Sequence, residues 1–423
     1  MPGLVELRRA GDLILSNLVW VYHHPEADAD LVTGRIHIDA ADLHLKQQTR
    51  AVYRAISAAL AEIGLGPEHV LHQRVHLHDM RDYGRWVDVL ATDFPDWRPA
   101  TTVFGEGAGL PPGIEVAVEL VASATARAEV VRSEFAAAAT DPFPGATTAG
   151  DWIFTSAVVP VNPDGRVVDS SRDLKPYGNI EAVTEFEPQG GLGRHDERLA
   201  AQMLAVYGNM RRILEAAGGD LNSLVKQNGY VRMHMKSFTP IEAARRSLFT
   251  TAALAPPAST VQVADLGPSD EAMLQFEAIG IRRGANTELT RIASSATTPY
   301  GFYTPVARAG HVVFTAGELA YSSDIGGVVG AWENDAGRSL VPQSRFVARR
   351  IAALFAAAGV EPGGIKRLNV YLRDRGHSEA WRRLTLEELA GADPAIVETT
   401  VLDCGPYESC LFELDGIGEA AKE

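Results

Sequence analysis

The chain has 423 residues, 46% of them hydrophobic and 22% charged, which excludes disordered and fibrous classes and predicts about two to four domains. Asp and Glu outnumber Lys and Arg by 54 to 39, so the net charge of −15 disfavours nucleic acids and anionic membrane surfaces as partners. We therefore expect a small-molecule partner. The two cysteines, Cys404 and Cys410, are too few for a disulfide scaffold and lack metal-ligand spacing, which favours a cytoplasmic protein without a bound metal.

The apolar run from Leu13 to Tyr22 follows two arginines, as a secretion signal would. It is short, has no small-residue cleavage site and continues into two histidines. We therefore predict a buried strand here rather than a signal peptide or a membrane segment.

A short phrase recurs three times along the chain, as Ala-Gly-Asp at 10–12 and 149–151 and as Ala-Gly-His at 309–311. Each phrase precedes a short apolar run, a pattern typical of a glycine turn that leads into a strand. Three copies of one unit are therefore expected.

Each copy also carries an amphipathic helical pattern that ends in a glycine, as expected for a left-handed helix cap. The interval from this glycine to an aliphatic residue of the next strand is identical in all three: Gly64 to Leu77, Gly218 to Val231 and Gly359 to Leu372. A Thr-Val pair follows in each copy, and after it an acidic residue in the last strand: Glu119, Glu277 and Asp415.

The order of elements in each copy is strand, strand, helix, strand, helix, strand, strand, which predicts an α+β unit with its helices on one face of a sheet. We place the copies at 1–122, 140–283 and 295–418, with the two joins as surface connections. Copy two contains an inserted loop near 162–198. Its glycines do not follow a strand and open a helix, so no nucleotide cofactor is expected.

The strand after the first helix has one apolar face, suited to the helices, and one polar and aromatic face. The second face carries His76, Tyr230 and Tyr371 in the three copies. We hypothesise that these faces meet and that clefts between copies hold the functional site. Placement of these three side chains on outer surfaces would exclude this arrangement.

Several phrases resemble the Rid proteins, also called the YjgF-type or reactive intermediate deaminase family: 305-PVARAGHVVFTAGELA, 225-VKQNGYVRMHM, 70-VLHQRVHLHDM, 98-RPATTV and 272-AMLQFEAIG. The resemblance implies the chorismate-mutase-like α+β fold, which usually forms homotrimers with ligand sites between subunits. It therefore implies three tandem Rid domains forming an intramolecular pseudo-trimer, either monomeric or paired as a dimer.

The resemblance also implies an arginine, three residues before the strand valine, that binds the substrate carboxylate. The corresponding positions are Ala100, Ala258 and Glu398, so no copy keeps it and ordinary deamination is in doubt. Arg232 and Arg373, at matching strand positions, are candidate substitutes.

The family's acidic residue corresponds to Glu119, Glu277 and Asp415, which are candidate general acids or bases; structural salt bridges are the alternative. Glu398 joins them as a catalytic candidate if it shares a cleft with Asp415.

Four residues are candidates for substrate binding besides the two arginines. Copy three alone keeps the family's ligand-facing glycine, at Gly317, and Tyr300 resembles the aromatic residue that covers the ligand. Tyr371 lies on the polar strand face. His72, His76 and His78 alternate on one strand face, but no third metal ligand of a different element is evident, so hydrogen-bonded histidines are expected.

We favour a specialised enzyme that hydrolyses, deaminates or tautomerises a small imine, enamine or carbonyl metabolite in one cleft. A chorismatase-like hydrolase of a small carboxylate and a non-catalytic metabolite-binding pseudo-trimer are the two alternatives.

Overall fold

A computed structural model describes residues 5–21, 40–132, 142–177, 194–233, 239–249, 251–266, 271–294, 301–331 and 336–421. Residues 178–193 of the predicted inserted loop, and Tyr300, lie outside these residues, and the last residues of that predicted loop, 194–198, begin a helix instead. The predicted buried strand near the N-terminus is present as β2 (Leu13–Ser16), in which every residue is buried.

Copy one contains five strands and two helices in the predicted order. They are β1 (Leu7–Ala10), β2, α2 (Ala40–Glu62), β3 (Val70–Leu77), α3 (Tyr83–Asp93), β4 (Ala100–Gly105) and β5 (Val116–Ser123). Their order in the sheet is β1-β2-β5-β3-β4, with β3 and β4 parallel and the other pairs antiparallel.

Copy two repeats this topology. Its elements are β7 (Ala146–Ala149), β8 (Trp152–Thr155), α4 (Arg194–Ala216), β9 (Leu224–Val231), α5 (Thr239–Leu248), β10 (Ala258–Gln262), β11 (Asp265–Leu266) and β12 (Leu274–Ile281). The sheet order β7-β8-β12-β9-β10 is that of copy one.

Copy three follows the same plan with a small added hairpin. Its elements are β14 (Val306–Ala309), β15 (Val312–Thr315), β16 (Tyr321–Ser322), β17 (Gly327–Val328), α6 (Ala336–Ala357), β18 (Ile365–Leu372), α7 (Ser378–Glu388), β19 (Ala395–Thr400), β20 (Asp403–Cys404) and β21 (Phe412–Glu419). The main sheet order is β14-β15-β21-β18-β19.

Both sets of repeated glycines have the predicted conformation. The turn glycines Gly11, Gly150 and Gly310 have φ values of 56°, 56° and 59°, and the cap glycines Gly64, Gly218 and Gly359 have values of 77°, 87° and 77°. Side chains with a Cβ rarely adopt these values, so glycine is required in each copy.

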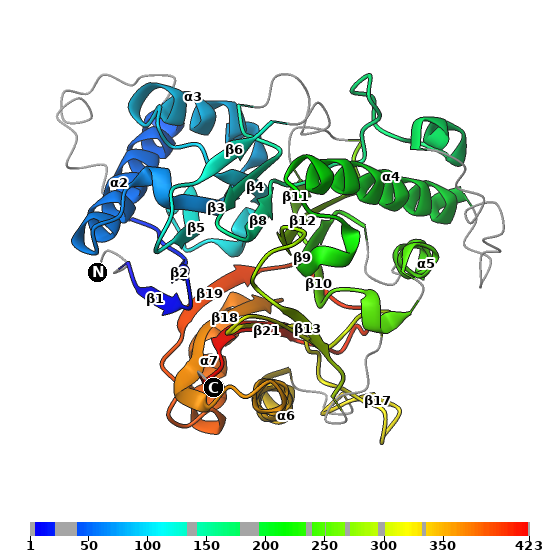
Figure 1. Ribbon diagram of the computed structural model, residues 1–423. Coiled ribbons are helices and arrows are strands. Elements are labelled where there is room, and N and C mark those ends of the chain that lie inside the picture. The colour runs from blue at the N-terminus through cyan, green and yellow to red at the C-terminus, as the bar shows by residue number, and fades with distance from the viewer. Residues whose placement is uncertain are drawn as a thin grey trace.

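The three copies form a pseudo-trimer, with α2, α4 and α6 on the outside and the sheets toward the centre (Figure 1). Short strands tie neighbouring copies together: β11 of copy two pairs with β4 of copy one, and β20 of copy three pairs with β10 of copy two. The joins, expected to be plain surface connections, each contain a strand. β6 (Glu129–Val131) extends the sheet of copy two at β7, and β13 (Leu289–Ile292) extends that of copy three at β14.

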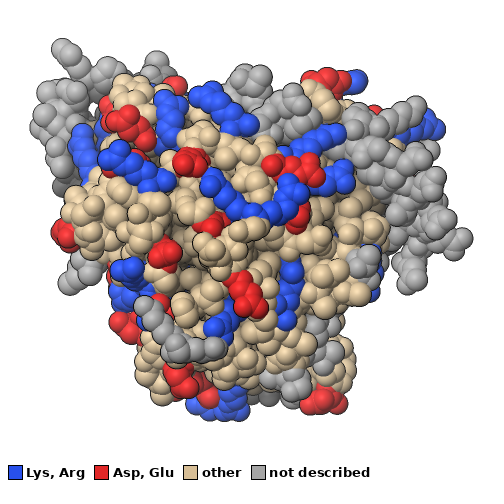
Figure 2. Space-filling model, viewed as in Figure 1, with Lys and Arg blue, Asp and Glu red and all other residues tan. Residues whose placement is uncertain are grey.

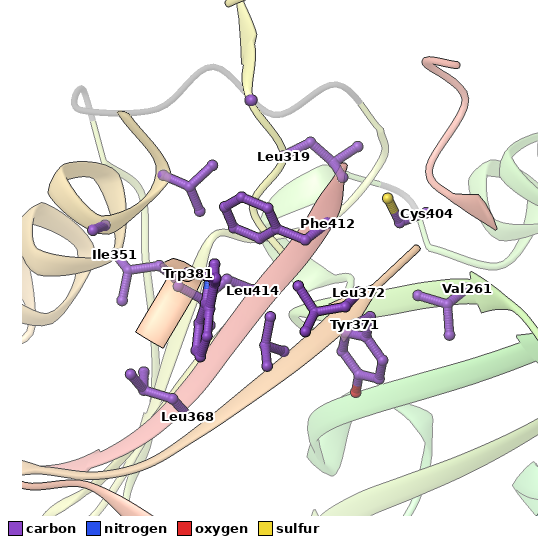
Figure 3. Close-up of a cluster of buried hydrophobic side chains, with 14 of the residues drawn as sticks. Val261, Leu319, Ile351, Leu368, Tyr371, Leu372, Trp381, Cys404, Phe412 and Leu414 are labelled. Atoms are coloured by element: carbon purple, nitrogen blue, oxygen red, sulfur yellow. The ribbon is translucent and has the colours of Figure 1, made fainter. Parts of the chain in front are cut away.

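Each copy has a hydrophobic core between helices and sheet, and that of copy three also takes in Phe104 of copy one and Val261 of copy two. Figure 3 shows part of this cluster, where Trp381 of α7 meets the ring of Phe412 edge to face and Tyr371 lies beside the strands of copy two. A fourth cluster joins all three copies and includes Leu15, Trp152 and Phe314. The sheets therefore pack on one another through an apolar layer as well as a polar one.

The face of the molecule seen in Figure 2 carries positive and negative side chains interspersed over its surface. Among the described helices, none combines the length and the apolar character needed to cross a bilayer.

Candidate functional site

The polar faces of the three sheets meet at the centre of the pseudo-trimer, as the pattern of the middle strand predicts. His76, Tyr230 and Tyr371 occupy equivalent positions in β3, β9 and β18, and all three are at most 2% exposed. Tyr230 of copy two stacks on Phe104 of copy one at 4.5 Å. The outer placement that would have excluded sites between copies is therefore not observed.

Two of the predicted catalytic acids share one cation at this centre. Arg74 donates to Glu119 Oε1 at 2.7 Å and to Glu277 Oε1 at 2.6 Å, and Arg367 lies 3.1 Å from Glu119. Burial alone would raise the pKa of Glu119 and Glu277, but the Arg74 guanidinium outweighs it and holds both pKa values below the usual range. Both carboxylates are ionised and connect three copies electrostatically.

The third acid, Asp415, is enclosed by donors from two copies. Lys226 Nζ lies 3.2 Å from it, Asn369 donates to it at 2.6 Å, and the Ser259 hydroxyl also donates to it. Lys226 completes its contacts with Thr315 O at 2.8 Å and Ser259 Oγ at 2.8 Å. Asp415 is thus a well-satisfied carboxylate within a network between copies two and three.

The histidines of copy one are hydrogen-bonded within this same centre. His72 Nε2 lies 3.3 Å from Glu277, and His76 Nδ1 contacts Glu106. In the described part of the chain, no group of three or more His, Cys, Asp or Glu side chains is arranged to hold a metal ion.

Backbone hydrogen bonds between copies identify the equivalent positions at the three boundaries. Ala157 N donates to Thr101 O at 3.0 Å, Gly317 N to Ala258 O at 3.0 Å, and Leu18 N to Ile396 O at 3.4 Å. The pairing of the strands gives the same equivalence. In each copy the acceptor residue directly precedes the residue that pairs with Arg74, Asn228 or Asn369 on the middle strand.

This register corrects the alignment drawn from the Thr-Val pairs. The positions equivalent to Ala258 are Thr101 and Ile396, not Ala100 and Glu398. An arginine is still missing from all three. Glu398 accepts a hydrogen bond from Ser378 at 2.6 Å and lies 4.0 Å from Arg382, both on α7, so it faces the helices and does not meet Asp415.

At each boundary one residue of the last strand faces the backbone hydrogen bond between the copies, and this residue differs from boundary to boundary. The equivalent positions on β5, β12 and β21 are Ala117, Gln275 and Glu413. Between copies three and one, Ala117 belongs to an apolar cluster with Leu18 and Val397. Between copies one and two, Gln275 Nε2 donates to Val103 O at 2.8 Å. Between copies two and three, the position carries a carboxyl group.

Glu413 is fully buried, and no described side chain forms a hydrogen bond with its carboxyl oxygens. Burial and then the charge of Asp415 raise its pKa to about 8, against the opposing effects of Lys226 and of a hydrogen bond from the backbone N–H of Thr260. Its carboxyl group lies directly against Gly317, where a side-chain methyl group would overlap it. Tyr371 is its direct partner on β18, and the Tyr371 hydroxyl is without a described hydrogen-bond partner.

A second buried acid, Glu318, lies beside Glu413. Burial raises the pKa of Glu318 to about 7, although Arg350 Nε, at 3.0 Å, opposes the rise. Tyr303 is also buried, and burial and then the charges of Glu318 and Glu413 raise its pKa. The preceding residue, Phe302, donates its N–H to Glu242 on α5 of copy two, so both copies build the surroundings. We call Glu413, Glu318, Tyr303 and Gly317 the acidic group.

The structure brings Gly317 and Tyr371, two predicted substrate-binding residues, to Glu413. Arg232 and Arg373 lie at strand ends, 3.5 Å from Asp265 and 3.8 Å from Asp403 respectively, so each arginine faces an aspartate. Tyr300 is outside the described residues. The thiols of Cys404 and Cys410 are buried, and burial raises the pKa of both.

Sequence reasoning missed Glu413, Glu318 and Tyr303. Glu413 could have been found, because it lies two residues before Asp415 and therefore on the same strand face. Tyr303 stands only three residues after the tyrosine chosen from the same phrase. Glu318 lies in the turn after β15, where no alternating strand pattern shows which side chains are buried.

The chain is similar to several known proteins. The family model described as endoribonuclease L-PSP matches residues 31–124 and 184–279. The E. coli YjgF gene product is 27% identical, with 37% of this chain and 99% of that chain covered and a TM-score of 0.28. Yeast Mmf1 is 21% identical over the same shares, with a TM-score of 0.28.

A chorismatase structure is 13% identical, with 83% of this chain and 93% of that chain covered and a TM-score of 0.48. No match was found among curated proteins. The two matched segments fall in copies one and two, and copy three shares their topology strand for strand. Copies one and two therefore match the family model, and the chain consists of three tandem Rid-like, or YjgF-like, domains in one polypeptide.

Proposed function

We propose that this chain is an enzyme with one active site, at the boundary between copies two and three, that acts on a small imine, enamine or carbonyl metabolite. Glu413 is the general acid. The observation that carries this proposal is a fully buried carboxyl group that no described side chain hydrogen-bonds, and whose pKa is raised to about 8. Such a group keeps its proton at neutral pH and has a free donor to offer.

The chemistry follows from that proton. Protonated Glu413 donates it to the imine nitrogen, or to the β-carbon of an enamine, and the substrate carbon becomes electrophilic. Water then adds to this carbon and the C–N bond breaks, so that an imine and water give a carbonyl compound and ammonia. Glu318, whose pKa is raised to about 7, is suited to accept the proton that the attacking water loses and to pass it to the leaving nitrogen. Glu413 recovers its proton from the hydroxyl group as the carbonyl forms and ammonia leaves.

The other buried acids are less suited to this role. Glu119 and Glu277 are bound to Arg74, and their lowered pKa values leave no proton to donate near neutrality. Asp415 is occupied by Lys226, Ser259 and Asn369. We assign these three carboxylates to holding the copies together around the site.

The test is the rate of carbonyl formation from small imines that an amine oxidase generates in solution. Glu413→Gln should lower kcat/KM by about a hundredfold or more, because the isosteric amide cannot donate an acidic proton. Gln275→Ala, at the equivalent position of copy two, is the matched control and should leave the rate nearly unchanged. Equal rates for wild type and Glu413→Gln would contradict the proposal, and binding without any turnover would indicate a non-catalytic metabolite-binding protein.

A further inference from the structure

We infer that the acidic group binds a small nitrogen compound that is neutral or positively charged and that has no carboxylate. This inference rests on the proposed function, since it names the substrate class of the same site. It follows from the charges that the described residues bring to this boundary.

The two cations nearest the acidic group are already engaged. An ammonium group has three N–H donors, and Lys226 directs its donors at Ser259 Oγ, Thr315 O and Asp415 Oδ2. Arg350 pairs with Glu318 at 3.0 Å and donates to Tyr321 O at 2.5 Å. A substrate carboxylate would have to displace one of these partners from its cation.

The residue facing Gly317 from copy two offers no charge to an anion. Ala258 is 5% exposed, and its carbonyl oxygen already accepts the Gly317 N–H at 3.0 Å. Its methyl side chain cannot form the paired hydrogen bonds by which a guanidinium binds a carboxylate.

The acids themselves favour the opposite charge. When protonated, Glu413 donates a hydrogen bond to a neutral nitrogen or oxygen; when ionised, it pairs with a protonated nitrogen. A carboxylate placed beside Glu413 and Glu318 would meet like charges in a buried, weakly screened environment. The ionised acidic group therefore repels anions, and the protonated one offers a carboxylate a single O–H donor without the positive charge and paired donors of a guanidinium.

The experiment compares three planar probes of one shape and different charge: acetamidinium, acetamide and acetate. Their affinities are measured by ligand-detected NMR near the pKa of Glu413, with wild type, Glu413→Gln and the control Gln275→Ala. We expect acetamidinium to bind wild type at least about tenfold more tightly than acetate, and to lose at least about tenfold in Glu413→Gln but not in Gln275→Ala.

The outcomes separate the two proposals. If acetate binds most tightly and Glu413→Gln weakens it, the site is real and the inference about its substrate class is wrong. If Glu413→Gln changes the binding of none of the probes, the site itself is wrong and both proposals fall. Ala258→Arg provides a further check: it should raise the affinity for acetate and lower that for acetamidinium, and an unchanged preference would place Ala258 away from the ligand.

Discussion

Two acids on one strand face, Asp415 and Glu413, have opposite surroundings although they are two residues apart. Asp415 receives donors from Lys226, Ser259 and Asn369, whereas no described side chain donates to Glu413. Removal from water without a side-chain partner favours the neutral acid, which is why the pKa of Glu413 rises. The candidate site therefore depends on the absence of a side-chain hydrogen-bond partner for Glu413 rather than on an unusual residue type.

This raised pKa makes stability depend on pH in a defined direction. Between its ordinary value of 4.5 and about 8, Glu413 holds a proton in the folded state that the unfolded chain releases, so folding stability falls as pH rises through this window. Lys226, Asp415, Glu318 and Tyr303 are the charged or titratable groups around it. Glu413→Gln removes this loss, and at alkaline pH we expect its unfolding free energy to exceed that of wild type by about 2–4 kcal/mol.

Urea unfolding across this pH range measures the effect. Glu277→Gln is the contrasting variant, because the lowered pKa of Glu277 stabilises the fold above the unfolded value and that stability is lost as pH falls. It should be less stable than wild type at neutral pH. Parallel pH profiles for wild type and Glu413→Gln would show that Glu413 titrates normally.

At the scale of elements, the turns, helix caps and main strands could be predicted because they repeat. Three glycines with φ near 60° and three with φ near 80° stand at fixed places in each copy. By contrast β6, β11, β13 and β20 have two to four residues each, too few for a periodic pattern. β11 and β20 form by pairing with a strand of another copy, and β6 and β13 by pairing with the next strand of the chain.

Which positions of the three copies are equivalent could not be predicted as well as the main strands. The Thr-Val pairs suggested one shared position, but the register equates Thr101, Ala258 and Ile396. A small shift in the pairing of two strands changes which residues face a boundary, and the register of this pairing cannot be determined from the sequence alone. The fold class was therefore predictable, while the placement of the site required the contacts between copies.

Gly317, in the turn after β15, lies against the Glu413 carboxyl group, and substitutions there test this contact. Gly317→Ala places a methyl group against the Glu413 carboxyl, which should cost about 1–3 kcal/mol and displace the acid. The reverse change at the equivalent position, Ala157→Gly, is the control and meets no carboxyl group. In a double-mutant cycle with Glu413→Ala the cost should largely disappear, as measured by urea unfolding; additive costs would mean that the two residues do not touch.

At the scale of the molecule, fusing three copies into one chain allows their boundaries to diverge. The boundary between copies three and one is apolar at Ala117, that between copies one and two ends in Gln275, and that between copies two and three keeps Glu413. A homotrimer of identical subunits would carry the same residue at all three boundaries. The fused chain can thus devote two boundaries to assembly and one to chemistry.

The central ion network supports this division of roles. Arg74 of copy one joins Glu119 of its own copy to Glu277 of copy two, and Arg367 of copy three also reaches Glu119. Buried charges of this kind require good geometry to compensate for their lost hydration. They fix how the copies sit together, and so determine the surroundings of Glu413.

The most direct test of one functional boundary is a crystal structure of the protein soaked with acetamidinium. The account predicts the ion at the boundary between copies two and three, within hydrogen-bond distance of Glu413 or Glu318, and no ion at the equivalent positions Gln275 and Ala117. An ion bound at either of those positions, or bound only away from Glu413, would contradict the account.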